Sequence, residues 1–257
     1  MTRVLFSKNI RLLAMVVAAG FLFVAPSFAQ GGGDNGRGAG GPQITDAKEA
    51  AAFQAYEQAK GDKKIQAGVA FVNSYPKSVA AGRVADQVVS LSYGRKDWSD
   101  FDAMTDKALA INPDDVVVLP LAGWVIPRNI KDGDPDTQKK LDKAEGYDKH
   151  AIDVISTMAE PATLTDEQFS SLKAAALSEA HSGLGLVYAR EQKPEDAIAQ
   201  FTQVTKPDAT DLFMLGASYE MTGKHAEAAA QFQKCSAMSG PLQAPCQQNA
   251  ADTAKEQ

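Results

Sequence analysis

The sequence has few of the residues from which catalytic and metal sites are usually built. It contains two cysteines, three histidines and two tryptophans among 257 residues. No two histidines have the spacing of a zinc-binding helix, and no histidine lies close in sequence to a candidate nucleophile. The glycine-rich phosphate loop and the serine nucleophile elbow are also missing. The sequence therefore predicts no catalytic residue, no metal site and no cofactor.

Residues 1–29 have the pattern of a cleavable secretory signal peptide. Three basic residues (Arg3, Lys8 and Arg11) begin it, and small residues end it at Ala29. The apolar run between them, at 12–24, is 13 residues long and too short to span a bilayer as a mature helix, although an uncleaved anchor is the alternative interpretation. No cysteine follows that could carry a lipid. We expect a periplasmic or secreted protein with no stable membrane anchor after cleavage.

The segment after the predicted cut, residues 30–44, is rich in glycine and is expected to be a flexible linker. Cleavage removes three basic residues and no acidic ones, so the net charge changes from −6 to −9. An acidic protein repels the phosphates of nucleic acids and anionic membrane surfaces. We therefore expect no nucleic-acid partner.

One pattern occurs twice near the C-terminus, with a separation of 31 residues. In each copy, Leu-Gly-x2-Tyr precedes Ala-x3-Phe, and the spacings place each group on one side of a helix. Small residues let two such helices approach closely, and the aromatic rings fill the remaining space. The positions expected to pack in this way are Leu184, Gly185, Tyr188, Ala197 and Phe201 in the first copy, and Leu215, Gly216, Tyr219, Ala228 and Phe232 in the second.

This pattern resembles the tetratricopeptide repeat (TPR), W-x2-L-G-x2-Y followed by A-x3-F and P. His181 and Leu212 stand at the tryptophan position, and the period is 31 residues rather than about 34. Two further segments, 71–78 and 108–113, are similar to repeat endings of the family. The resemblance implies an all-α fold, an antiparallel helix-hairpin solenoid (a TPR-like superhelix), over residues 45–257 and most clearly over 178–240.

Apolar periodicity together with proline, glycine and capping residues predicts further helices. Their expected ranges are 45–60, 64–75, 79–93, 97–111, 114–126 and 136–158, with a loop at 127–135. Thr165 and Gln168 form a predicted capping box that opens another helix. A last helix at 242–255 is expected to cap the solenoid with a polar face. Three consecutive valines make a strand the competing interpretation of segment 114–126.

Both cysteines, Cys235 and Cys246, lie in the predicted C-terminal cap. An exported protein with an even number of cysteines is expected to form a disulfide. Free thiols and a redox-active pair are the alternatives, but a separation of eleven residues lacks the C-x-x-C geometry of redox motifs.

Two other features suggest chemistry only weakly. Asp132-Gly-Asp134-Pro-Asp136 begins like a calcium loop, but Thr137 and Lys143 replace the glycine and the glutamate that such a loop needs. We expect a solvated loop that caps the next helix, with weak calcium binding as the alternative. The three histidines, His150, His181 and His225, belong to no recognisable catalytic group, and His181 is expected to pack in place of the tryptophan.

In the TPR family, partners usually lie along the concave surface formed by the first helix of each hairpin. Matching by the resemblance places ten residues there: Glu179, Ser182, Leu186, Ala189 and Arg190 from the first repeat, and Thr210, Phe213, Ala217, Glu220 and Met221 from the second. The main groove candidates are Ser182, Leu186, Arg190, Phe213, Ala217 and Met221. Packing of these side chains against a neighbouring repeat or the cap is the alternative interpretation.

The predicted function is an exported scaffold that binds a protein, as a peptide or a helix, in a concave TPR groove within the cell envelope. An accessory subunit of an envelope complex is the alternative among binding proteins. An enzyme with a nonstandard site in residues 114–165 is the alternative from another class, because this segment is least like a repeat. An enzyme is expected to have convergent polar groups in a closed pocket there.

Overall fold

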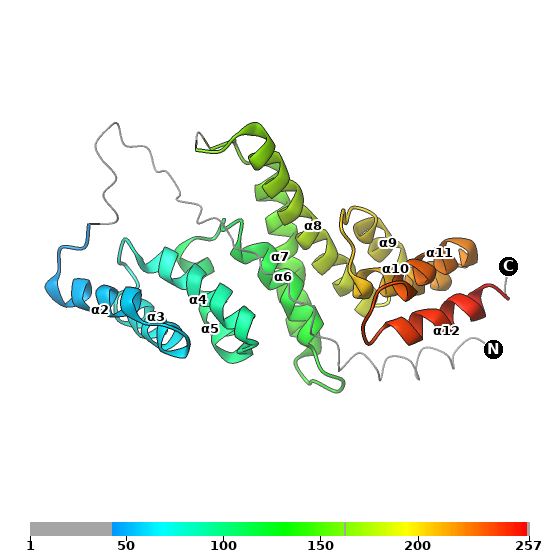
Figure 1. Cartoon of the computed structure of the whole chain (residues 1–257), viewed down its shortest axis with the longest axis horizontal. Helices are drawn as coiled ribbons and strands as arrows, with labels where there is room; N and C mark the ends of the chain where they lie inside the picture. Colours follow the sequence, from blue (N-terminus) through cyan, green and yellow to red (C-terminus); the bar gives the residue numbers. More distant parts are fainter. Residues whose placement is uncertain (1–42, 162, 256–257) are drawn as a thin grey trace. The chain divides into compact units, whose positions relative to one another are not determined.

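A computed structural model describes residues 43–161 and 163–255 and contains only helices within those ranges (Figure 1). The predicted signal peptide and nearly all of the predicted linker lie outside the described residues. None of the described helices is long and apolar enough to cross a membrane. The helices are α2 (Ala47–Gln58), α3 (Asp62–Ser74), α4 (Ala81–Arg95), α5 (Trp98–Ile111), α6 (Val118–Asn129), α7 (Thr137–Thr157), α8 (Asp166–Arg190), α9 (Pro194–Phe201), α10 (Ala209–Met221), α11 (His225–Ser236) and α12 (Gln243–Thr253).

These helices fall into two compact units, whereas the sequence analysis predicts one continuous repeat domain. The boundary lies inside α6, between Leu119 and Pro120. We call the described residues before it the N-terminal unit and those after it the C-terminal unit. From α2 to α5 and from α7 to α12, helices that follow one another in the sequence pack together as antiparallel neighbours, which is the arrangement of a helix-hairpin solenoid.

The N-terminal unit is built from α2 to α5 around a core of aromatic and branched side chains. Tyr56, Phe71 and Phe101 are fully or almost fully buried. The close approach of α3 and α4 depends on Gly68, because a Cβ atom there would lie 2.4 Å from Val88. Local signals set the helix ends; for example, the carboxylate of Asp46 accepts hydrogen bonds from two backbone amides in the first turn of α2.

Segment 114–126, for which a strand is the competing interpretation, is helical from Val118 onward, so the helix begins four residues later than predicted. Asp115 begins α6 by accepting hydrogen bonds from the backbone amides of Val117 and Val118, both at 2.9 Å. The predicted loop begins three residues too early, because α6 continues through Pro127 to Asn129. Side chains support this last turn, since Arg128 and Asn129 donate to the backbone carbonyls four residues before them.

The C-terminal unit contains both predicted repeats, as the hairpins α8–α9 and α10–α11. The capping box of Thr165 and Gln168 is present, and the helix that it opens runs without a break into the first repeat. Glycine and phenylalanine meet in both hairpins: a Cβ atom on Gly185 would lie 2.8 Å from Phe201, and one on Gly216 would lie 2.7 Å from Phe232. The predicted pattern therefore packs the helix pairs as the sequence analysis expects.

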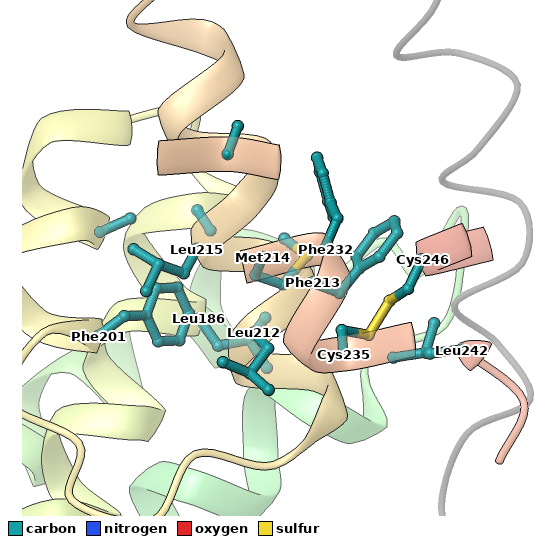
Figure 2. Packing of buried hydrophobic residues seen from close by; sticks show 13 residues of the cluster. Leu186, Phe201, Leu212, Phe213, Met214, Leu215, Phe232, Cys235, Leu242 and Cys246 are labelled. Carbon is teal, nitrogen blue, oxygen red and sulfur yellow. A yellow bond between two sulfur atoms is a disulfide. The ribbon is translucent and has the colours of Figure 1, made fainter. Parts of the chain in front are cut away.

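The helix α12 closes the end of the second repeat, as predicted. It packs on α11 and touches α10, and Leu242 enters the apolar core of the repeats (Figure 2). A disulfide joins Cys235 of α11 to Cys246 of α12, with a Cα–Cα distance of 5.8 Å and both side chains fully buried. The opposite side of α12 exposes polar residues such as Gln247 and Gln248, which suits a cap.

We expect the disulfide to stabilise the C-terminal unit by about 3 kcal/mol or less, the range of the chain-entropy model for a loop of this length. A Cys235→Ala/Cys246→Ala variant should therefore unfold at lower urea concentration than the wild type, and amides of α12 should exchange faster. Reductant added during denaturation should destabilise the wild type and leave the variant unchanged. Equal sensitivity of both proteins to reductant would contradict the disulfide.

Candidate functional site

The six main groove candidates separate into a buried group and an accessible group. Ser182, Leu186 and Phe213 are 2%, 0% and 8% exposed, and the last two belong to the core shown in Figure 2. Phe213 packs against Phe232, with ring centroids 5.8 Å apart. These three side chains do not form an open groove, so for them the packing interpretation holds.

The other three candidates, Arg190, Ala217 and Met221, remain accessible. Met221 is 42% exposed, and Arg190 and Ala217 are half-buried. Arg190 and Met221 occupy equivalent positions of the two repeats, 31 residues apart, at the C-terminal ends of α8 and α10. The two helices contact each other. Among the six main candidates, the accessible ones therefore lie toward these helix ends, and we call Arg190, Ala217 and Met221 the accessible surface.

Arg128 of α6 contacts Ser182, one of the three buried candidates. Its side chain is 7% exposed, and Nη2 donates to the hydroxyl of Ser182 and to Oδ1 of Asp211, both at 2.8 Å. The hydroxyl of Ser182 also donates to Oδ1 of Asp211, at 2.6 Å. The guanidinium lies 4.1 Å from the ring centroid of Trp124. One arginine thus joins α6, α8 and α10 and occupies the inner face of the repeats.

Asp211 has a second role at the start of α10. Asp208 and Asp211 form a reciprocal capping box, in which each carboxylate accepts from the backbone amide of the other. Asp208 also lies 3.6 Å from Nη2 of Arg128. The capping box therefore positions Asp211 independently of its contact with Arg128.

A second buried carboxyl, Asp148 of α7, lies between two glycines. The side chain is fully buried, and neither carboxyl oxygen has a hydrogen-bond partner among the described residues. A Cβ atom on Gly123 of α6 would lie 1.9 Å from its Oδ1, and one on Gly183 of α8 would lie 2.3 Å from its Oδ2. The two glycines thus leave the space that this carboxyl fills.

Burial favours the protonated forms of Asp148 and Glu179, whereas Asp211 is paired directly with Arg128. Burial raises the pKa of Asp148 well above its ordinary value, while the positive charge of Arg128 opposes the shift and Glu179 adds to it. Burial also raises the pKa of the half-buried Glu179 to about 7, again against Arg128. The pKa of Asp211 is raised by burial and lowered by Arg128. We call Arg128, Asp148, Glu179, Ser182 and Asp211 the buried charged cluster.

Arg190 lies close enough to this cluster to be affected by it. Burial lowers the pKa of its guanidinium, the negative charge of Asp132 opposes that shift, and the positive charge of Arg128 adds to it. Its Nε is buried without a hydrogen-bond partner among the described residues. Arg190 therefore presents a cation at the edge of the accessible surface.

The calcium-like loop and two of the histidines are engaged in contacts with other residues of the protein. Asp134 binds Lys140 at 2.6 Å and accepts a hydrogen bond from the backbone amide of Asp136, so this carboxylate is engaged within its loop. No group of metal-binding side chains is found in the described parts of the chain. Nδ1 of His181 lies 2.8 Å from Gln200, and Nδ1 of His225 lies 3.4 Å from Glu220.

Sequence reasoning missed the buried charged cluster apart from Ser182 and Glu179. Arg128 and Asp211 are separated by 83 residues, and Arg128 fell in a predicted loop. One local feature could have indicated Asp211, since Asp208-x-x-Asp211 before an apolar run has the spacing of a capping box. A local feature also marks Asp148, which lies at helical spacing between Ala144 and Ala151 on the buried side of α7.

Comparison with known proteins gives structural likenesses only. No protein-family model matches the chain, and no curated protein matches it. A thermophilic TPR protein of Thermus thermophilus is similar with a TM-score of 0.46 and 16% identity, over 80% of this chain and 96% of that one. A TPR protein of Parabacteroides merdae has a TM-score of 0.34 and 13% identity, over 80% and 82%. The TPR domain of P58(IPK) has a TM-score of 0.32 and 13% identity, over 81% and 65%.

Proposed function

We propose that this protein is an exported scaffold that binds a protein partner at the accessible surface formed by Arg190, Ala217 and Met221. The observation that supports the proposal is the separation of the groove candidates by burial. Met221 is one of the few large apolar side chains that are exposed, and a half-buried cation, Arg190, occupies the equivalent position of the preceding repeat. An exposed apolar side chain beside a charge suits recognition of an amphipathic peptide or helix.

The predicted signal peptide places this binding in the cell envelope or outside the cell, as part of the same proposal. Binding in a larger envelope complex, as an accessory subunit, uses the same surface. Export can be tested separately by locating the full-length chain after cell fractionation, with N-terminal sequencing expected to give Gln30 as the first residue.

The buried charged cluster bears on the enzyme alternative. Polar groups do converge near residues 114–165, but Asp148, Ser182 and Asp211 are 0%, 2% and 3% exposed. A substrate cannot reach side chains that are buried in this way, so the cluster favours a structural role over catalysis.

A photocrosslinking amino acid placed at Met221 tests the binding proposal. When the full-length chain with its predicted signal peptide is expressed in its own cells, we expect one protein of the envelope fraction to be crosslinked from position 221. The same probe at Gln233, an exposed residue of the second helix in that hairpin, is the matched position on another face and should not capture it.

An Arg190→Ala/Met221→Ala variant should reduce recovery of that protein about tenfold or more, the loss expected when about 1.4 kcal/mol of binding free energy disappears. Met238→Ala, which removes another exposed methionine, is the control and should leave recovery unchanged. Equal recovery by the double variant and the wild type would place binding elsewhere on the protein.

A further inference from the structure

We propose that Asp148 forms a proton-dependent contact between α6, α7 and α8, which makes the C-terminal unit more stable and less open at acidic pH than at basic pH. This inference concerns the response of the fold to pH, and it does not depend on the binding proposed above.

In the described part of the chain, the surroundings of Asp148 provide no hydrogen-bond donor that could stabilise its ionised carboxylate. The carboxyl is fully buried, has no hydrogen-bond donor among the described residues, and is enclosed by the backbones of α6 and α8 at Gly123 and Gly183. Water cannot solvate an ionised carboxylate in such a place, and leaving it unpaired is far more costly than burying the neutral acid. The proton on Asp148 is therefore part of the packing of the three helices.

The described charged groups that face Asp148 include no separate cation that could pair with a negative charge on its carboxyl. The guanidinium of Arg128, on α6, is bound by Asp211 and Ser182, and Asp208 lies near it as well. From α8 comes Glu179, which repels a negative charge on Asp148. One guanidinium is thus shared among several carboxyl groups of α7, α8 and α10, and deprotonation of Asp148 adds a charge without a partner.

The sign of the pH dependence follows from linkage. The folded unit holds the proton of Asp148 at pH values where the unfolded chain has released it, because burial raises the folded pKa. The contribution of Asp148 to stability is then fully present below the ordinary aspartate pKa of 3.8 and is lost as the pH rises toward the folded value. Glu179 adds a loss of the same sign between its ordinary value of 4.5 and about 7.

An Asp148→Asn variant tests the contact, because asparagine has nearly the same size and cannot ionise. Thermal unfolding of the mature wild-type chain, residues 30–257, should show a lower Tm at pH 8 than at pH 5. Asp148→Asn should reduce this difference in Tm. At pH 8 the Tm of the variant should be about 4 °C or more above that of the wild type, a shift large enough to be resolved by thermal unfolding of a unit of this size. Amides of α6 and α8 should exchange about tenfold more slowly in the variant at pH 8.

Two matched variants separate Asp148 from other carboxyl groups. Asp153→Asn changes an exposed residue of the same helix and should keep the wild-type pH dependence. Glu179→Gln should remove only the part of the dependence that ends near pH 7. An Asp148→Asn variant with the full wild-type dependence would overturn the proposal.

A measurement on the unaltered protein covers the case in which Asp148→Asn does not fold. The carboxyl carbon of Asp148 can be followed by NMR as the pH is raised in the wild type. We expect no ionisation of this carboxyl near pH 4, and unfolding or opening of the unit to accompany its ionisation at higher pH. A normal aspartate titration in the folded protein would overturn the proposal.

Discussion

An Arg128→Met variant is expected to lose about 3–5 kcal/mol of unfolding free energy, the range observed when one partner of a buried ion pair is removed. Arg128 and Asp211 are 7% and 4% exposed, so Asp211 would remain buried without its cation. The hydroxyl of Ser182 would still donate to Asp211, but it carries no charge. Methionine retains much of the aliphatic chain but not the guanidinium that lies over Trp124, so the loss includes this cation–π contact as well as the ion pair. Urea denaturation followed by circular dichroism measures it.

Arg83→Met provides the matched control. Arg83 binds Glu57 at 3.1 Å, but the two side chains are 50% and 42% exposed. Exposed ion pairs contribute about 1 kcal/mol or less, so this variant should remain close to the wild type. A double variant, Arg128→Met with Asp211→Asn, should be less destabilised than the sum of the single changes, because it removes both charges. An Arg128→Met variant as stable as Arg83→Met would contradict the buried ion pair.

The helices of this fold could be predicted from the sequence because their signals are local. Gly185 and Phe201 lie within one hairpin, and their contact follows from the repeat pattern alone. The capping box at Thr165 and the disulfide between Cys235 and Cys246 also involve residues close in sequence. Such features depend on helix periodicity and on the geometry of short chain segments, and both can be inferred from residues close together in the sequence.

The burial of the predicted groove could not be predicted in the same way. The repeat pattern assigns Ser182 and Leu186 to the face that lies away from the second helix of their hairpin. It does not say whether a third helix covers that face. For Ser182, α6 does so through Arg128, which lies just after Pro127 in a segment predicted to be a loop. Leu186 instead lies in the core of the repeats. Covering of this kind depends on pairs of residues far apart in the sequence, and a single sequence gives no signal for them.

A Gly183→Ala variant is expected to be destabilised by about 3 kcal/mol, the upper part of the usual range for overpacking. The new Cβ atom would lie 2.3 Å from Oδ2 of Asp148 and 2.8 Å from the backbone carbonyl carbon of Gly123. The first atom ends a fully buried side chain and the second belongs to the backbone of α6, so we expect α6 to move away from α8. Gly146→Ala on α7 is the control, because no atom lies within 4 Å of its built Cβ. That change should stabilise the protein by about 0.5–1 kcal/mol through helix propensity.

A comparison of the two glycines identifies the atom that limits the approach of the helices. At Gly123 the three nearest atoms to a built Cβ all belong to the carboxyl of Asp148, whereas at Gly183 two of the three belong to the backbone of Gly123. Truncation by Asp148→Ala should therefore restore most of the stability lost in Gly123→Ala and only part of that lost in Gly183→Ala. Denaturation of the two double variants measures this difference. Equal rescue would mean that the helices can separate freely, and the carboxyl of Asp148 would then not be held between fixed backbones.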